Sequence, residues 1–286
     1  MRKKLLAFLT ITRPANAAIT ALSVFIAGLI SNHEWRQHGG VLLLAAVSAG
    51  CIAAGGNIYN DFCDRKLDQA QKPHRPLPAG TITPKSALGW GIANFAVGNL
   101  FAIMLGWKMV FIAIAATVLL ILYSRYWKGM PLIGNVAVAS TAALAFIYGG
   151  IAVEGYAAAL WAAELAFLYH LSREIIKDME DFPGDALHHA NTLIVKYGLN
   201  AGRWAASLTL LLLAILLPLP HVLGDFRSAY LWIALLGVLP ILIVAVYLLW
   251  RWTSSAQFQR LSAVLKYNML VGLLALYCGR PGTTLG

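Results

Sequence analysis

Long apolar runs follow one another along almost the whole chain, and they restrict the possible folds more than any other feature. Only 12% of the 286 residues are charged and 59% are hydrophobic, whereas a soluble domain carries about 25% charged residues. A helix needs about 20 mostly apolar residues to cross the hydrocarbon core of a bilayer. By this criterion nine spans are expected, at residues 15–32, 39–60, 86–106, 109–126, 132–153, 156–176, 203–220, 229–250 and 262–279.

No linker or change in composition divides the chain. We therefore expect residues 1–286 to form a single all-α domain, a multi-span integral membrane bundle of nine transmembrane helices.

Lysine and arginine are distributed unevenly over the segments between the spans. With the N-terminus inside, 18 of the 22 Lys and Arg residues fall on the inner side. The outer side then holds only Arg36, Lys108, Arg227 and Arg280. Because basic residues mark the cytoplasmic side of a membrane protein, we expect a cytoplasmic N-terminus and residence in the cell membrane. The net charge of +10 does not indicate nucleic-acid binding, since the basic residues form no RNA- or DNA-binding motif.

Eight of the twelve carboxylates lie in two short clusters at the inner ends of the second and sixth predicted spans. The clusters consist of Asp61, Asp64 and Asp68, and of Glu174, Asp178, Glu180, Asp181 and Asp185. Both contain acids at spacing i, i+3, i+7, with another polar residue four positions upstream, Asn57 or Glu174. On a continuous helix such residues share one face, about 60° wide. Pro183 and Gly184 should end or bend the second helix before Asp185.

Grouped carboxylates at the C-terminal end of a helix are unfavourable without a bound cation, because the helix dipole is also negative there. Hard oxygen ligands on one face suit Mg²⁺, which keeps several waters and bridges to substrate phosphates. The sequence therefore predicts a magnesium site made by both clusters: Asp61, Asp64, Asp68, Asp178, Asp181 and Asp185. The alternative is that these are solvated loop acids beside basic neighbours.

Basic residues close to both clusters could bind a phosphate group. The candidates are Arg75, Lys128, Arg173 and Lys177. Prolines on both sides of Arg75 stiffen its position, whereas the others also fit an ordinary excess of basic residues on the inner side. For Arg173 a salt bridge with Glu174 is the alternative.

Polar residues inside the predicted spans are candidates to line a central cavity: Asn16, Asn94, Asn135, Tyr169, His170 and Asn268. A hydrogen bond between helices is the alternative for each.

Several motifs together resemble the UbiA-type intramembrane prenyltransferases. Residues 60–68 (NDFCDRKLD) and 72–80 (KPHRPLPAG) resemble the first signature of that family, and residues 13–16 (RPAN) resemble its opening motif. The stretch from Tyr123 through Lys128 to Asn135 and the second acidic cluster, followed by Thr192 and Leu193, match its later signatures. The resemblance covers residues 8–279, and nine helices is the count of the family.

The resemblance implies that Mg²⁺ held by the two aspartate clusters grips a prenyl diphosphate, whose C1–O bond ionises to an allylic cation that an acceptor attacks. The active site would face the cytoplasm. Asn57 and Asn60 would support the first cluster, and Arg75, Lys128 and Lys177 would contact the diphosphate. Asn16, Tyr123, Asn135 and Arg173 are further candidates for substrate binding. No obligate protein partner is evident.

The acceptor is indicated by residues 173–185 (REIIKDMEDFPGD), which are most similar to the branch whose acceptor is geranylgeranylglyceryl phosphate. The departure from that branch is at Phe182 and Pro183. An aromatic or quinone-precursor acceptor, such as 4-hydroxybenzoate, homogentisate or a tetrapyrrole, is the alternative within the class. A divalent-cation transporter and a catalytically inactive homologue are alternatives from other classes; the position of the acids at one face rather than the bilayer midplane disfavours the transporter.

Overall fold

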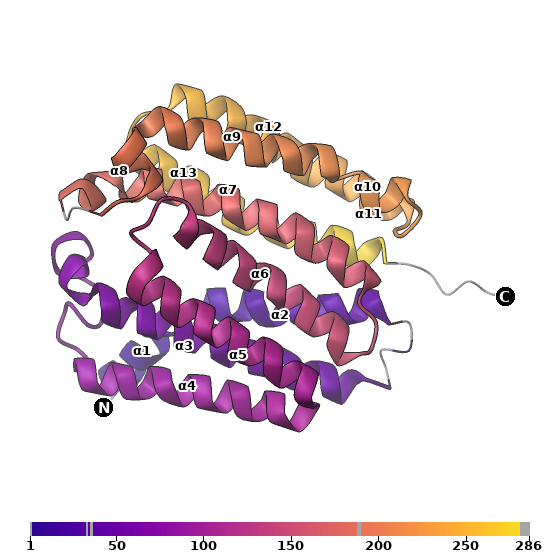
Figure 1. Cartoon of the computed structure of the whole chain (residues 1–286), viewed down its shortest axis with the longest axis horizontal. Coiled ribbons are helices and arrows are strands. Elements are labelled where there is room, and N and C mark those ends of the chain that lie inside the picture. Colours follow the sequence, from indigo (N-terminus) through magenta and orange to yellow (C-terminus); the bar gives the residue numbers. More distant parts are fainter. Residues whose placement is uncertain (1, 33, 35–36, 188–189, 281–286) are drawn as a thin grey trace.

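The computed structural model describes residues 2–32, 34, 37–187 and 190–280, so Arg36 lies outside the described part. Within those residues every regular element is a helix, and the long helices lie side by side in one bundle (Figure 1). The prediction of an all-α protein is confirmed.

The first half of the bundle contains six α-helices and a π-helical segment. They are α1 (Arg2–Ile11), α2 (Pro14–Ser31), α3 (Gly39–Gln71), α4 (Pro84–Leu105), α5 (Trp107–Leu122), η1 (Tyr123–Trp127) and α6 (Ile133–Ala152).

The second half begins with the long helix α7 and ends with α13. Its elements are α7 (Ala157–Leu187), α8 (Leu193–Tyr197), α9 (Leu199–Leu216), α10 (Leu219–Val222), α11 (Ser228–Ile233), η2 (Ala234–Val238), α12 (Leu239–Arg251) and α13 (Ser255–Cys278).

Helix boundaries follow from residues that cap or break helices. Pro84 occupies the first turn of α4, where its missing N–H costs nothing, and the hydroxyl of Thr83 accepts a hydrogen bond from the Ser86 N–H at 3.2 Å. Gly106, at φ +111°, allows the tight turn from α4 into α5. At the start of α13, Ser254 and Gln257 form a reciprocal capping box.

Eight segments are long and apolar enough to cross a bilayer, and they coincide with all the predicted spans except 156–176. The helix at that position, α7, is not among them, because His170, Arg173 and Glu174 make its second half polar. The predicted count of nine is therefore not confirmed.

The prediction that Pro183 and Gly184 end or bend the second acidic helix before Asp185 is wrong as far as the end of the helix is concerned. Helix α7 continues through Pro183 to Leu187. A proline removes one hydrogen bond, to the carbonyl four residues earlier, and strains the helix locally. The carbonyl left without its usual partner is that of Met179, and Ser255 of α13 donates a hydrogen bond to the next carbonyl, that of Glu180.

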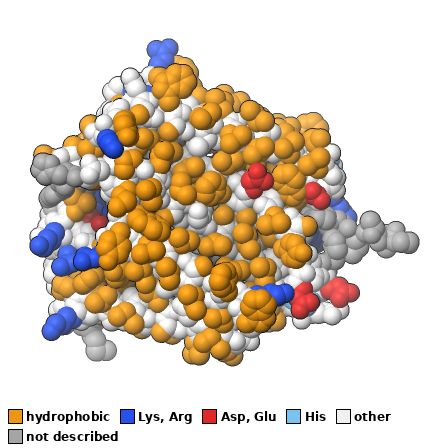
Figure 2. Space-filling view, in the orientation of Figure 1, with side chains coloured by type: hydrophobic (Ala, Val, Ile, Leu, Met, Phe, Trp, Pro, Cys, Tyr) orange, Lys and Arg blue, Asp and Glu red, His pale blue; other side chains and the backbone are white. Residues whose placement is uncertain are grey.

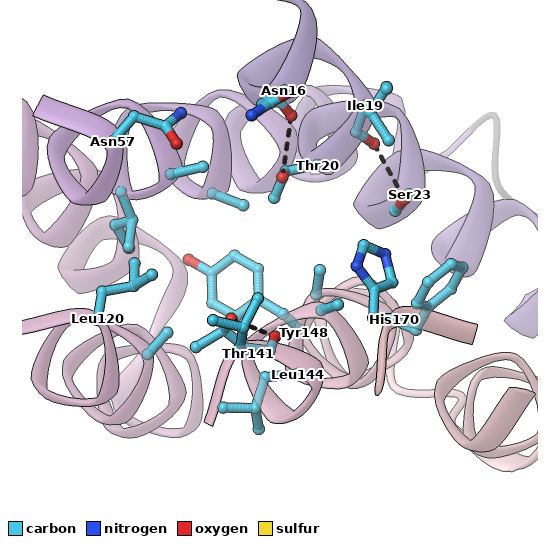
Figure 3. A pocket seen from close by; sticks show the side chains of 18 of the residues that line it. Asn16, Ile19, Thr20, Ser23, Asn57, Leu120, Thr141, Leu144, Tyr148 and His170 are labelled. Carbon is cyan, nitrogen blue, oxygen red and sulfur yellow. Dashed lines mark hydrogen bonds between the residues drawn. The ribbon is translucent and has the colours of Figure 1, made fainter. Parts of the chain in front are cut away.

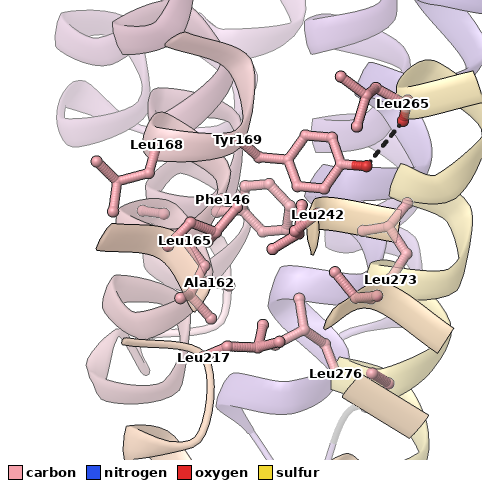
Figure 4. Close-up of a cluster of buried hydrophobic side chains, with 14 of the residues drawn as sticks. Phe146, Ala162, Leu165, Leu168, Tyr169, Leu217, Leu242, Leu265, Leu273 and Leu276 are labelled. Atoms are coloured by element: carbon pink, nitrogen blue, oxygen red, sulfur yellow. Dashed lines mark hydrogen bonds between the residues drawn. The ribbon is translucent and has the colours of Figure 1, made fainter. Parts of the chain in front are cut away.

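Close helix packing relies on small residues. A Cβ added at Gly149 of α6 would lie 2.1 Å from the Val24 carbonyl oxygen of α2. On the other side of α7, Leu165 and Leu168 pack with Leu213, Leu242 and other side chains of α9, α12 and α13 (Figure 4). The Tyr169 hydroxyl, 3.0 Å from the Leu265 carbonyl and 2.9 Å from Asn268 Oδ1, ties α7 to α13 (Figure 4).

The face of the bundle shown in Figure 2 is apolar over its broad middle. Large side chains such as Trp107, Phe111 and Leu236 are more than 70% exposed, as expected for groups that face lipid. Lys and Arg side chains gather mainly at the left of Figure 2, the end where α8 and the loop from α3 to α4 lie. The C-terminal ends of α3 and α7 therefore meet at the basic end of the bundle.

Candidate active site

A polar cavity of about 250 Å³ opens between the C-terminal ends of α3 and α7, and residues of both acidic clusters line it. Its acidic residues are Asp64, Asp68, Asp178, Asp181 and Asp185, and its basic residues are Arg13, Lys72, Arg75, Arg125, Lys128 and Lys177. Asn60 and Tyr123 also line this space. We call it the polar cavity. Clusters more than 100 positions apart in the chain thus face the same space.

Helix α3 presents the first cluster, because it runs unbroken past the acids to Gln71. Asn60 Nδ2 donates to Asp64 Oδ2 at 2.8 Å, and Lys128 forms an ion pair with the same carboxylate oxygen. Burial lowers the pKa of Lys128, but Asp64 and Tyr123 together raise it, and the pKa is raised overall. Asp64 is therefore held between an amide and an ammonium group at the edge of the cavity.

Asp61 differs from the other two acids of its cluster. Asp61 and Asp68 are both buried, at 4% and 3% exposed, but Asp61 alone of the three does not line the polar cavity. Arg13 and Arg75 both form ion pairs with its Oδ1, the second at 3.2 Å. Arg75 also bonds Asp68 Oδ2 at 2.7 Å. These contacts make Asp61 an anchor for two guanidinium groups, so direct metal binding is better suited to Asp64 and Asp68.

Arg13 reaches Asp61 from a strained turn. Its backbone lies in the left-handed region, at φ 51° and ψ 67°, between α1 and the Pro14 that begins α2. A residue other than glycine holds this conformation only where the surrounding structure compensates for it. The ion pair with Asp61 and the hydrogen bond from Asn57 Nδ2 to the Thr12 carbonyl, at 2.9 Å, secure the turn to α3.

The second cluster is less completely paired. Asn135 Nδ2 of α6 donates to Asp178 Oδ2 at 2.8 Å, and Lys72 lies 3.3 Å from Asp181 Oδ1. Among the described residues, neither Asp178 nor Asp185 forms an ion pair. Burial raises the pKa of Asp178 to about 7 and that of Asp185 to about 6. Neither carboxylate is therefore paired directly with a cation in the described chain, although Lys177 acts on both to lower the pKa.

The donor set fits Mg²⁺ bound together with a phosphate group. Within the described chain no three His, Cys, Asp or Glu side chains are already clustered as a metal site. Mg²⁺, however, needs only one or two carboxylates and completes its shell with water and substrate oxygens. Asp64 and Asp68 on α3, and Asp178 and Asp185 on α7, offer such oxygens from two sides of one cavity.

A second cavity, of about 220 Å³, lies deeper in the bundle among α2, α3, α5, α6, α7 and α13 (Figure 3). We call it the central cavity. Asn16, Thr20, Asn57 and His170 line it together with many alanines and larger apolar side chains. A smaller apolar cavity of about 80 Å³ adjoins it and shares His170 and Met269.

Of the polar residues predicted to line a central cavity, some do so and others form hydrogen bonds between helices instead. Asn16 and His170 line the central cavity, whereas Asn135 binds Asp178. Asn268 Nδ2 donates to the Gly237 carbonyl at 2.8 Å, a hydrogen bond between elements. The prediction is wrong for Asn94, whose side chain bonds the Trp90 carbonyl of its own helix and lines none of the three cavities.

Arg173 faces the central cavity, not the polar one. Its Nη1 lies 2.8 Å from Glu174 Oε1, so the alternative of a salt bridge is what the structure contains. Lys177 lies 3.6 Å from Glu174 Oε2 and also lines the polar cavity. Glu174 and Lys177 therefore form the boundary between the two cavities on α7.

Sequence reasoning did not identify the π-helical turn η1 or Lys266. The segment η1 places Tyr123 on the polar cavity and closes with a hydrogen bond from the Lys128 N–H to the Tyr123 carbonyl at 2.9 Å. Such turns are frequent at functional sites. Lys266 lines the central cavity from α13, and the only signal in the sequence was a lysine within an apolar span.

The chain is a membrane-embedded prenyltransferase: it matches the model of the UbiA prenyltransferase family over residues 18–270 and belongs to that family. It is 39% identical over 269 residues to the digeranylgeranylglyceryl phosphate synthase of Methanopyrus kandleri, covering 94% of this chain and 97% of that relative.

Solved structures agree with this assignment. A structure from a study of digeranylgeranylglyceryl phosphate synthase in membranes has a TM-score of 0.77 and 28% identity, over 98% of this chain and 99% of that one. A UbiA homologue from Archaeoglobus fulgidus, solved with DMAPP and Mg²⁺, shares the fold with a TM-score of 0.72 at 20% identity, over 93% of this chain and 98% of that one.

Proposed function

We propose that this prenyltransferase transfers a geranylgeranyl group from its diphosphate to geranylgeranylglyceryl phosphate, with Mg²⁺, and releases diphosphate. The similarity to the synthase of Methanopyrus kandleri supports this acceptor, because it extends over nearly the whole of both chains. The alternative acceptors are 4-hydroxybenzoate, homogentisate and tetrapyrroles.

The observation that carries the proposal is the mixture of charges in the polar cavity. Five carboxylates and six basic side chains line it. A site for a bare cation needs carboxylates without competing basic groups, whereas a diphosphate with Mg²⁺ needs both. The lining therefore supports binding of a metal–diphosphate complex and disfavours a cation transporter.

In this proposal each cavity has a separate task. Asp64, Asp68, Asp178, Asp181 and Asp185 hold the metal, with Asp61 orienting Arg13 and Arg75. When bound, Mg²⁺ supplies positive charge that stabilises the diphosphate as it leaves. Arg75, Lys128 and Lys177 donate hydrogen bonds to the remaining diphosphate oxygens. The apolar walls of the central cavity hold the prenyl chain and exclude water from the allylic cation.

The proposal extends to the arrangement in the membrane. We take α7 as the ninth span, because it lies within the bundle beside α6 and α9 (Figure 1). The basic end of the bundle, with the N-terminus and the polar cavity, then faces the cytoplasm across the cell membrane. Residues 1–286 form one domain, with no obligate protein partner evident.

An acceptor screen with purified protein, geranylgeranyl diphosphate and Mg²⁺ tests this function. We expect mass spectrometry to find geranylgeranyl transfer to geranylgeranylglyceryl phosphate, and none after the metal is chelated with EDTA. Prenylation of 4-hydroxybenzoate or homogentisate in place of the lipid acceptor would exclude the proposed acceptor. Metal flux into proteoliposomes without prenyl diphosphate would support a transporter instead.

Replacing Lys128 by methionine should raise the KM for prenyl diphosphate about 10- to 100-fold, since a hydrogen bond to a charged group contributes about 1.5–3 kcal/mol. The measurement is initial rate against donor concentration at saturating Mg²⁺. Lys85→Met is the control, because Lys85 is exposed at the start of α4 and lines none of the three cavities. An unchanged donor KM in Lys128→Met would show that Lys128 serves only to pair with Asp64.

A further inference from the structure

Lys266 is a basic residue that forms no ion pair with either acidic cluster among the described residues. It lies on α13 and lines the central cavity together with His170, Arg173 and Met269. It does not line the polar cavity where the diphosphate is proposed to bind. Its role therefore has to be found in the central cavity.

Arg173 lies at the same level of the bundle as Lys266. Its Nε donates to the Ser262 carbonyl at 3.3 Å, and Ser262 is one helical turn before Lys266 on α13. The Arg173 guanidinium is positive and lines the same cavity as the Lys266 ammonium. Two helices thus bring basic groups together at one end of an otherwise apolar space.

The charges at this end of the cavity do not balance. Glu174 is the only carboxylate that lines the central cavity in the described chain, and it is already paired with Arg173 at 2.8 Å and with Lys177 at 3.6 Å. Lys266 forms no ion pair among the described residues. An unpaired charge inside a membrane protein is costly, and such residues mark sites that bind charged groups.

We propose that Lys266 and Arg173 form a second anion site, which binds the phosphate of the acceptor and so selects an acceptor with a phosphomonoester head group. This inference rests on the proposed function, because it takes the phosphorylated glycerol lipid as the acceptor. The lipid chain of the acceptor then lies along the apolar wall that includes Met269 and continues into the adjoining apolar cavity.

The position of the site relative to the polar cavity fits two substrates bound at once. Glu174 and Lys177 separate the two cavities on α7, and Asn57 and Asn60 lie one turn apart on α3, one in each lining. A phosphate at Lys266 therefore leaves the polar cavity free for the diphosphate. An ammonium group binds phosphate as a strongly charged hydrogen-bond donor, and arginine can replace it with a different geometry.

The test compares Lys266→Met, Lys266→Arg and the control Arg260→Met. Arg260 is an exposed residue of α13 that lines none of the three cavities. We expect Lys266→Met to raise the KM for geranylgeranylglyceryl phosphate about tenfold or more, the effect of about 1.4 kcal/mol, while the KM for geranylgeranyl diphosphate stays unchanged. Lys266→Arg should restore much of the acceptor affinity, and Arg260→Met should change neither constant.

Two further measurements separate the possible explanations. Direct binding of geranylgeranylglyceryl phosphate without donor should weaken in Lys266→Met, whereas binding of geranylgeranylglycerol, which lacks the phosphate, should not change. The result should be the same in vesicles of phosphatidylcholine and in vesicles that also contain phosphatidylglycerol. An effect confined to the anionic vesicles would assign Lys266 to bilayer phosphates and overturn the proposal.

The outcomes also distinguish this inference from the proposed function. If the wild-type protein binds the phosphorylated acceptor through Lys266 but prenylates only an aromatic compound, the anion site stands and the proposed function fails. If the wild-type protein prenylates geranylgeranylglyceryl phosphate and Lys266→Met has the same acceptor KM and binding, the proposed function stands and the anion site is excluded.

Discussion

Replacing Asp64 or Asp178 by asparagine is expected to lower the rate of prenyl transfer at least about 100-fold, the scale at which single electrostatic groups act on a transition state. The two acids lie on different helices and line the same polar cavity. Loss of either one removes a carboxylate from one side of the proposed metal site. Because asparagine keeps the shape of aspartate, the loss measures charge and metal binding. The assay follows diphosphate release at saturating substrates.

Stability separates a catalytic defect from a folding defect in these variants. Burial raises the pKa of Asp178 to about 7. Without metal, the folded protein therefore holds the proton of Asp178 at pH values where the unfolded chain has lost it. Folding then binds a proton at this group, and stability falls as pH rises from the ordinary aspartate pKa of about 3.9 towards that value. The asparagine variant avoids this cost, and its thermal midpoint above neutral pH should be at least that of the wild type.

The matched control is Glu164→Gln on the same helix as Asp178. Glu164 is exposed and lines none of the three cavities, so its activity should stay within about twofold of the wild type. Wild-type rates in Asp64→Asn and Asp178→Asn, at limiting as well as saturating Mg²⁺, would contradict the assignment of both residues to metal binding.

Replacing Gly149 by alanine is expected to destabilise the protein by about 3 kcal/mol or more, at the upper end of the effects of overpacking. The added Cβ would lie 2.1 Å from the Val24 carbonyl oxygen and 2.8 Å from Ala27 Cβ, both on α2. A backbone carbonyl cannot rotate away as a flexible side chain can, so α2 and α6 would have to separate. The measurement is the midpoint of thermal unfolding in detergent.

Gly89→Ala on α4 provides the comparison, because nothing lies within 4 Å of a Cβ added at Gly89. Alanine has the higher helix propensity, so that variant should be as stable as the wild type or slightly more so. Activity should fall along with stability in Gly149→Ala, since α2 and α6 both line the central cavity. An unchanged midpoint in Gly149→Ala would show that α2 and α6 do not pack as closely as described.

Much of the fold follows from local patterns. Apolar runs of spanning length predicted eight of the helices that could cross a bilayer, because a helix in lipid must satisfy its backbone within a single segment. The helix α7 was predicted too, but its polar second half makes it less apolar than the others. The predicted end of α7 was wrong because the helix continues through Pro183 to Leu187, where Ser255 of α13 bonds the neighbouring Glu180 carbonyl, a contact between distant segments that local sequence does not show.

Spacing alone treated Asp61, Asp64 and Asp68 as equivalent members of one helix face. Tertiary contacts make them different, because Arg13 arrives from a strained turn and Arg75 from the next loop, and both pair with Asp61. Asp64 and Asp68 consequently line the polar cavity while Asp61 does not. No property of the helix itself distinguishes the three.

By itself the sequence determined the helices, the basic end of the bundle and the two acidic clusters, because hydropathy and residue spacing act within one segment. Only the tertiary structure decided that the two clusters share a cavity and that Arg173 forms an ion pair with Glu174. It also decided that Lys266 lines the central cavity without an ion pair in the described chain. These outcomes depend on which helices pack against each other, and packing joins residues that are far apart in the chain.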